Sequence, residues 1–262
     1  MKIAVCVKSV PDTETKIALN ANKTNIDTNG VKFITSPYDE FALEEALKIK
    51  DANPDTTVTC ISLGSNESKE VLRDCLARGA SDSVHITVDD GLKLTPLATA
   101  KILAKVLGEE KYDLIFCGQQ GVGTDNSMIP SMLGSLLNVT SVNMIISFSL
   151  IDGSKFSVKR EIEGAQETIE GSLPAILSAQ KGLNEPRYPS IKGVMAARKK
   201  EIKTLDLNTL GISDEINKIN DLIKIKAMAL PQGKTGGKTI DGDPDNQVKE
   251  LVSLLRQEAK VL

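Results

Sequence analysis

The chain has 262 residues, of which 40% are apolar and 26% are charged, so it can build a packed core and is not globally disordered. Its 32 basic and 35 acidic side chains give a formal net charge of −3, which offers no basic footprint for nucleic acid and no attraction to a membrane surface. No apolar run approaches the roughly 20 residues that a membrane-spanning helix needs. The length fits one large α/β domain or one domain with an appendage.

The number and spacing of the cysteines and histidines limit the metal and catalytic sites that the chain can form. The four cysteines, at positions 6, 60, 75 and 117, form no CxxC motif and no short metal-type spacing, which favours reduced, structural thiols and a cytoplasmic protein. The single histidine, His85, lies in a strand-like run, so a structural role is favoured over a catalytic triad, and a histidine-rich zinc site is excluded. The chain opens with the strand-like MKIAVCVK, which predicts neither a signal peptide nor a transit peptide and indicates a bacterial cytoplasmic location.

The first half of the chain alternates apolar runs with amphipathic segments. Residues 3–7 and 114–117 are continuously apolar and residues 58–63 and 84–88 are mostly apolar, as are strands that are buried on both faces of a parallel sheet. This alternation predicts a doubly wound, mostly parallel α/β sheet with helices on both faces. The expected helix ends are an N-cap at Ser36 before Pro37, a cap at Ser65 with a stop at Gly79, and a start at Thr95-Pro96 with a stop at Gly108.

Beyond residue 137 the pattern changes. Residues 142–150 and 156–162 indicate strands joined by a hairpin turn at Asp152-Gly153, and residues 174–177 indicate another strand. Residues 205–243 show little helical periodicity, whereas residues 246–260 form an amphipathic helix that docks either on the protein's own core or on a partner subunit. We therefore expect an α/β domain over residues 1–204 and a carboxy-terminal arm that ends in a helix over residues 205–262.

A glycine-rich segment follows the fourth predicted strand. Gly118, Gly121 and Gly123 lie between that strand and a helix that starts near Met128. Glycines let backbone N–H groups approach a phosphate, and doubly wound folds bind ligands at the carboxyl ends of their strands. The spacing is neither a Walker A motif nor GxGxxG, and the segment has no phosphate-binding lysine. Two interpretations stay open: a phosphate-binding nest, or a plain strand-to-helix turn in which Asp125 only caps the helix.

Motifs in the second half carry a more specific resemblance. Residues 160–167 read REIEGAQE, residues 173–176 read LPAI, and residues 183–191 read LNEPRYPSI, with Met195 and the basic run 198–200 behind them. The segments VCVKSVPD (residues 5–12) and SPYDE (residues 36–40) fit the same pattern. In one unbroken order over nearly the whole chain, these motifs resemble the electron transfer flavoprotein β subunit, of the adenine nucleotide α-hydrolase-like superfamily.

The resemblance implies an electron carrier rather than an enzyme, with no catalytic residues and no metal. Such a β subunit buries one AMP and pairs with an α subunit that holds the redox FAD. Electrons would come from flavin dehydrogenases of the acyl-CoA dehydrogenase type, as in fatty acid oxidation, and pass to the electron transfer flavoprotein–quinone oxidoreductase. In electron-bifurcating members a second FAD takes the place of AMP and NADH is the donor. The β subunit itself does not insert into the membrane or bind nucleic acid.

The resemblance also assigns residues by position. Thr13 and Tyr38 would lie near the flavin of the α subunit, although Tyr38 also fits an ordinary amphipathic position in a first helical turn. Glu161 would pair with an arginine of the α subunit's flavin domain, or is simply a solvated strand residue, and the arm would dock on the α subunit. A recognition loop for dehydrogenases would contain Tyr188, Pro189, Ser190, Ile191 and Met195, with Ile191 as its anchor. The AMP pocket would comprise Cys6, Ser36, Pro37, Tyr38, Asp39, Leu63, Gly118, Gln119, Gln120, Gly121, Val122, Gly123, Thr124, Asp125, Asn126, Ser127, Met128 and Ile129.

Three departures from the family pattern bear on the ligand. Ala165 stands where a second glycine is usual, Gln119 replaces a lysine, and the stretch after Asp125 reads NSMIP, ending at Pro130. That stretch lacks the Thr and Gln that suit the pyrophosphate of a second flavin, which favours AMP over FAD. A free adenine-nucleotide-binding protein, such as a universal stress protein or an ATP pyrophosphatase, is a further alternative, but the phosphate-loop motifs of both are absent.

Overall fold

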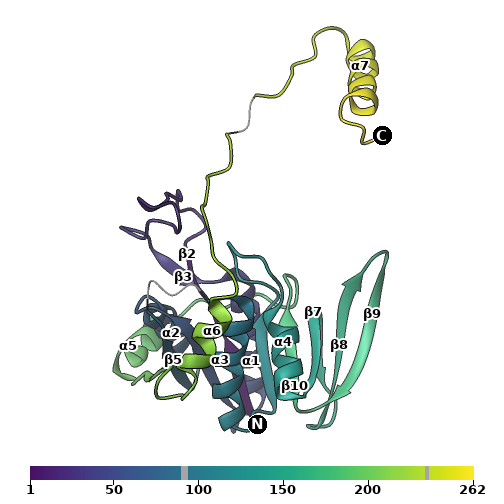
Figure 1. The fold of residues 1–262 in the computed structure, drawn as a ribbon. Helices are drawn as coiled ribbons and strands as arrows, with labels where there is room; N and C mark the ends of the chain where they lie inside the picture. Colours follow the sequence, from purple (N-terminus) through teal and green to yellow (C-terminus); the bar gives the residue numbers. More distant parts are fainter. Residues whose placement is uncertain (90–93, 234–235) are drawn as a thin grey trace. The chain divides into compact units, whose positions relative to one another are not determined.

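The computed structural model describes residues 1–89, 94–233 and 236–262 (Figure 1). The strands are β1 (Lys2–Cys6), β2 (Ser9–Pro11), β3 (Phe33–Thr35), β4 (Thr57–Gly64), β5 (Asp82–Thr87), β6 (Leu114–Gly118), β7 (Thr140–Leu150), β8 (Lys155–Ile162), β9 (Ala165–Ser172), β10 (Ala175–Ala179) and β11 (Lys203–Asp206). The helices are α1 (Pro37–Ala52), α2 (Ser68–Arg78), α3 (Pro96–Glu109), α4 (Ile129–Leu137), α5 (Ile191–Lys199), α6 (Ser213–Asn220) and α7 (Pro244–Gln257).

The main sheet has the strand order β11-β5-β4-β1-β6-β10-β7-β8-β9. All pairs from β11 to β7 are parallel, whereas β7–β8 and β8–β9 are antiparallel. The chain builds outward from β1 to β4 and β5 on one side and then returns to place β6 on the other side. The topological switch point of the sheet therefore lies at β1 and β6, where doubly wound folds bind their ligands.

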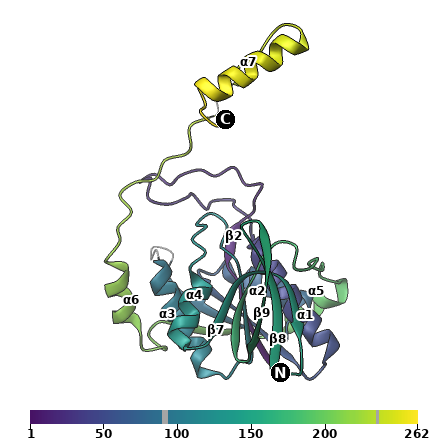
Figure 2. The same cartoon turned by 90° about the vertical axis from the view of Figure 1, so that its right-hand side faces the viewer.

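Helices cover both faces of the parallel strands, as the sequence predicts (Figure 2). One face packs Ile3 and Val5 against Leu43 of α1 and Leu72 of α2. The opposite face packs Ala4 and other strand residues against α3, α4 and α6. Because successive strand residues point to opposite faces, only a continuously apolar strand can bury both. The predicted doubly wound architecture is confirmed.

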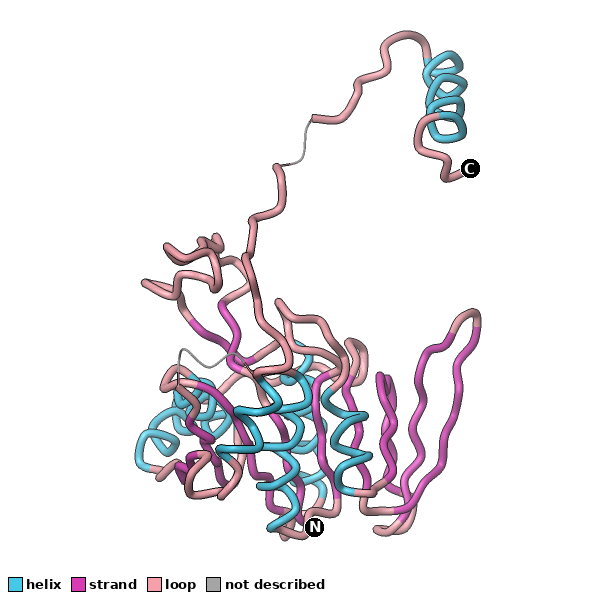
Figure 3. Tube along the Cα trace, in the orientation of Figure 1, coloured by secondary structure: helices cyan, strands magenta, loops and turns pink. Residues whose placement is uncertain are grey.

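The last strands extend the sheet as an antiparallel ribbon (Figure 3). β7 and β8 form the predicted hairpin through Asp152-Gly153, and Phe156 and Val158 of β8 are buried. β9 was not predicted, because it reads AQETIEGS and alternates between exposed and half-buried residues. It pairs along its whole length with β8, from Ala165 opposite Ile162 to Ser172 opposite Lys155.

The helix ends partly follow the prediction. Thr95 caps α3 as expected, since its hydroxyl accepts a hydrogen bond from the Ala98 N–H at 3.2 Å, and α3 runs one residue beyond Gly108. Gly79 ends α2 with a φ of 128°. Ser65 does not cap α2, a prediction that was wrong: residues 65–67 form a turn, and the helix starts at Ser68. Ser36 occupies the N-cap position of α1, but its hydroxyl forms no capping hydrogen bond.

The chain divides into two compact units. The first comprises Met1–Ile17 and Asp27–Lys226, and the second comprises Ala18–Ile26 and Ala227–Leu262. The boundary expected after residue 204 falls within the first unit, because β11 pairs with β5 and α6 packs against α3. The amphipathic helix predicted for residues 246–260 is confirmed as α7, and none of its residues is buried. Among the described residues, no helix combines the length and apolarity needed to cross a membrane.

Candidate functional site

A cavity of about 390 Å³ lies at the carboxyl ends of β1, β4 and β6. This volume is within the range of small-molecule binding sites. Its walls come from the ends of these three strands, from the loop that joins β6 to α4, and from the first residues of α3 and α4. The cavity thus occupies the switch point of the sheet, the place that the glycine-rich segment predicts.

Most of the residues assigned by resemblance to one pocket lie together in this cavity. Those that line it are Cys6, Asp39, Leu63, Gly118, Gln119, Gln120, Gly121, Thr124, Asn126, Ser127, Met128 and Ile129. Those that do not line it are Ser36, Pro37, Tyr38, Val122, Gly123 and Asp125. Ser36 is instead buried beside the loop, where its hydroxyl accepts a hydrogen bond from the Val122 N–H at 3.4 Å.

The loop from β6 to α4 is held by its own side chains. The Gln120 Nε2 group donates to the Asp125 carboxylate at 3.0 Å, and the Ser127 hydroxyl donates to Gln120 Oε1 at 3.1 Å. Asp125 therefore binds within the loop instead of acting as the N-cap of α4, whose N-cap residue is Met128 and lacks a side-chain cap. Gln119 also lines the cavity, and its buried Oε1 has no hydrogen-bond partner within the described structure.

Lys8 supplies a cation that the loop sequence itself lacks. It lies two residues beyond the end of β1, lines the cavity, and donates from Nζ to the Thr124 hydroxyl at 3.0 Å and the Val122 carbonyl at 3.4 Å. Burial lowers the pKa of Lys8, while the nearby carboxylates of Asp39 and Asp125 act in the opposite direction. An ammonium group has three N–H donors, so one remains for an anion in the cavity. Lys8 lies two residues after a central strand, and this position is the sequence signal that could have identified it as a residue of the site.

Asp39 holds two walls of the cavity together. Its Oδ2 accepts the Lys8 backbone N–H at 2.7 Å, and its Oδ1 accepts the Gly118 N–H at 2.9 Å. The carboxyl group therefore joins the end of β1 to the end of β6. Burial raises the pKa of Asp39 to about 7, against the effect of both hydrogen bonds and of the Lys8 charge, and with a smaller contribution from Glu40 in the same direction as burial.

Replacement of Asp39 by asparagine is expected to change how stability depends on pH. Because the folded-state pKa is raised to about 7 from 3.8, the folded protein holds this proton more tightly, so the associated stability is full below pH 4 and is lost as the pH rises through 7. The stability advantage of the wild type over Asp39→Asn should shrink between pH 5 and 7, by at most about 1.4 kcal/mol per pH unit. Melting temperatures of both proteins across this range measure it, and a constant difference would contradict the assignment.

The thiols and the histidine near the cavity are structural. Cys6 and Cys117 are register partners on β1 and β6, and both are buried free thiols. The hydrogen bond with Cys6 and burial raise the pKa of Cys117 well above its usual range, so it is not a reactive thiolate.

His85 is buried, and its Nε2 lies 3.0 Å from the carbonyl oxygens of both Gly64 and Ser65. Since carbonyls only accept, Nε2 carries the proton, and burial lowers the pKa of the ring. His85 therefore fixes the loop after β4.

A second candidate surface lies on α5, where the sequence analysis expected a loop. The Ser190 hydroxyl caps this helix by accepting the Gly193 N–H at 3.0 Å. Tyr188, Ile191 and Met195 are 91%, 84% and 64% exposed, and Ile191 and Met195 stand one helical turn apart. We call these three side chains, Tyr188 in the segment before the helix and Ile191 and Met195 on it, the apolar face of α5. Large apolar side chains that are exposed one helical turn apart are typical of a protein-binding surface.

The remaining predicted residues are separate from the cavity. Thr13 is exposed in the segment between β2 and β3, and Tyr38 is half-buried in the first turn of α1. Glu161 is exposed near the end of β8, and no ion pair to it is found among the described residues. Its neighbour Arg160 does pair, with Glu167 of β9 at 2.6 Å.

The family of the chain follows from comparisons with known proteins. Residues 23–210 match the family model of the electron transfer flavoprotein domain. Over its whole length the chain is 35% identical to the electron transfer flavoprotein subunit beta of Bacillus subtilis, all of which is covered. It is 33% identical to that of Dictyostelium discoideum and 30% identical to that of Homo sapiens, again over all of this chain and 99% of each relative. The chain therefore belongs to the electron transfer flavoprotein β-subunit family.

Proposed function

We propose that this chain is the β half of a heterodimeric electron transfer flavoprotein, paired with an α subunit that holds the redox FAD. The observation that carries the proposal is the end-to-end similarity to proteins named as β subunits, in a chain whose cavity lies at the switch point of the sheet. The chain acts as a carrier subunit: it supports the flavin domain, and Thr13 and Tyr38 lie near the flavin. Glu161, which is exposed, pairs with an arginine of the α subunit, and the arm docks on that subunit.

The ligand of the cavity in this proposal is AMP. Lys8 and the backbone of the loop from β6 to α4 hold the phosphate, and the ends of β1 and β4 hold the adenosine. The third donor of Lys8, which lines the cavity, supports a ligand that carries a negative charge. The alternative is a second FAD, as in electron-bifurcating members that use NADH. Pro130 near the start of α4 removes one backbone donor there, which favours the smaller ligand.

The electron partners in this proposal are flavin dehydrogenases of the acyl-CoA dehydrogenase type and a membrane quinone oxidoreductase. The apolar face of α5 docks the dehydrogenase, with Ile191 as its anchor. The Ile191 side chain is 84% exposed, and this supports the role. When a partner removes this much apolar surface from water, the free energy of binding becomes more favourable. A free adenine-nucleotide-binding protein would need no such face.

An electron-uptake assay tests the proposal. The chain is co-expressed with the α subunit encoded in the same organism, and the purified complex is mixed with an acyl-CoA dehydrogenase and its acyl-CoA substrate. The expected result is a stable heterodimer whose flavin absorbance is bleached by the dehydrogenase and recovers when the quinone oxidoreductase and a quinone are added. Failure of the two chains to co-purify, or a flavin that stays oxidised, would overturn the proposal.

A further inference from the structure

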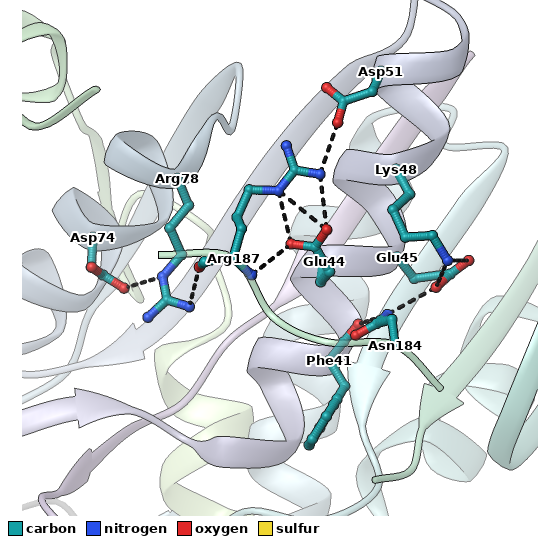
Figure 4. A network of polar contacts seen from close by, with 9 residues as sticks. All are labelled: Phe41, Glu44, Glu45, Lys48, Asp51, Asp74, Arg78, Asn184 and Arg187. Atoms are coloured by element: carbon teal, nitrogen blue, oxygen red, sulfur yellow. Dashed lines mark hydrogen bonds and ion pairs between the residues drawn. The ribbon is translucent and has the colours of Figure 1, made fainter. Parts of the chain in front are cut away.

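The segment that leads into α5 is tied to α1 before it reaches the apolar face. The Asn184 side chain donates from Nδ2 to the Phe41 carbonyl at 2.9 Å and to the Glu45 carboxylate at 2.8 Å (Figure 4). Glu45 is buried, and Lys48 on the next turn of α1 binds its carboxylate at 3.2 Å. Asn184 therefore fixes the segment to α1, three residues before a second point of attachment.

Arg187 is this second point of attachment, and three of its groups bind the carboxylate of Glu44. The guanidinium Nε and Nη2 lie 2.8 Å from the two carboxylate oxygens of Glu44, and the Arg187 backbone N–H donates to the same carboxylate at 3.0 Å (Figure 4). The Nη2 group also binds Asp51 at 2.8 Å. The Glu44 side chain is 8% exposed and the Arg187 side chain is 33% exposed, so this bidentate ion pair is half-buried. Such pairs fix a geometry more reliably than they add stability.

Arg78 of α2 holds the same residue from the other side. Its Nη1 donates to the Arg187 carbonyl at 3.1 Å, while Nε binds Asp74 at 2.7 Å and Nη2 binds Glu40 at 2.6 Å. The side chain, the N–H and the carbonyl of Arg187 are thus all bound. This residue directly precedes Tyr188, the first member of the apolar face.

The helix itself is fixed against α2. A Cβ atom on Gly193 would lie 2.1 Å from the Ala77 carbonyl oxygen, so glycine lets α5 approach the backbone of α2 closely. At the other end, Arg73 of α2 donates from Nη1 to the carbonyls of Ala197, at 2.6 Å, and Lys200. The Ala197 carbonyl also accepts the N–H of Lys200, the residue that follows α5, at 3.2 Å.

We propose that the pairing of Arg187 with Glu44 positions the apolar face of α5 for docking, so that Arg187 and Glu44 are positioning residues for partner recognition. This inference rests on the proposed docking function. The side chains of the face are exposed, while the backbone that carries them is bound at both ends. A face held in this way loses little conformational entropy when a partner covers it, and preorganisation of this kind increases affinity without adding a contact.

The test uses the heterodimer with Arg187→Lys, which keeps the charge but loses the bidentate fork. The expected result is a KM of the acyl-CoA dehydrogenase for the heterodimer that rises about fivefold, with kcat and flavin content unchanged. Amide hydrogen exchange should accelerate in residues 188–199 and stay unchanged in the central strands. Arg160→Lys is the matched control, because the Arg160 side chain is also 33% exposed and also pairs with a glutamate, and it should leave the KM unchanged.

A double-substitution cycle separates positioning from general weakening. If Arg187 acts by positioning Ile191, Arg187→Lys in an Ile191→Ala background should change the KM by less than about twofold. An equal factor in both backgrounds, or unchanged KM and exchange in Arg187→Lys, would overturn the inference. A KM unaffected by Ile191→Ala would instead overturn the docking function itself. If Arg187→Lys fails to fold, Glu44→Gln serves as the second variant, with the same expected results.

Discussion

Replacement of Gly118 by alanine is expected to lower the melting temperature of the heterodimer by roughly 5–10 °C and to remove most of the nucleotide bound in the cavity. A Cβ atom at this position would lie 2.3 Å from Asp39 Oδ1 and 2.8 Å from the backbone of both Asp39 and Tyr38. Two of these three neighbours are backbone atoms, so the strain is not relieved by a side-chain rotation. The first turn of α1 must move, and the cavity that it helps to line changes shape. Thermal unfolding and nucleotide analysis measure the two effects.

Gly108→Ala is the matched control for this substitution. Its Cβ would lie 3.6 Å from Leu137 Cδ2, which is an ordinary contact, and the residue is in the last turn of α3. Alanine is favoured over glycine in helices, so the melting temperature should stay the same or rise slightly. A Gly118→Ala protein that melts like Gly108→Ala and keeps its nucleotide would show that the approach of α1 to β6 is not needed for the site.

Truncation of Ile191 to alanine is expected to raise the KM of the acyl-CoA dehydrogenase for the heterodimer by about thirtyfold, the factor that corresponds to about 2 kcal/mol for a binding hot spot. The side chain is 84% exposed, so its loss leaves the fold intact. The melting temperature and the FAD and AMP content should therefore match the wild type. Steady-state electron uptake at varied heterodimer concentration gives the KM.

Ile151→Ala provides the comparison, because Ile151 is 51% exposed in the turn between β7 and β8, and these strands lie on the opposite side of the domain from α5 (Figure 1). It should leave the KM unchanged. Equal KM values for the wild type and Ile191→Ala would contradict the docking role of the apolar face, whatever the control shows.

The sequence predicted the parallel half of the fold well because each central strand is buried on both faces. A run such as Leu114–Gly118, in which every residue is buried, is typical of a strand that is covered by helices on both faces of a parallel sheet. The elements that were missed are short or lie at the edge of the sheet. β11 has four residues and α6 has eight, too few for a periodic pattern to stand out, and β9 is mostly polar because it borders the sheet. The loop expected in place of α5 came from the family resemblance, although Ser190 is a normal N-cap.

For the site, the glycine loop and the ends of β1 and β4 could be placed from the sequence, but the contacts between distant segments could not. Asp39 binds Lys8 and Gly118, which are 31 and 79 residues away, and no local pattern indicates that its carboxyl group points at two backbone N–H groups. The same applies to Lys8, whose link to Thr124 spans 116 residues. The assignment of single residues to AMP came from family resemblance, and Ser36 shows its limit: the residue supports the loop and does not line the cavity.

In the proposed function, the cavity at the ends of β1, β4 and β6 holds AMP. The most direct measurement is chromatography of the nucleotides released when the purified heterodimer is denatured. We expect one FAD and one AMP per heterodimer, with the AMP lost and the FAD kept in Gly118→Ala. Two FAD and no AMP would contradict it and assign the chain to the electron-bifurcating members, and FAD with no second nucleotide would show that the cavity is not a nucleotide site.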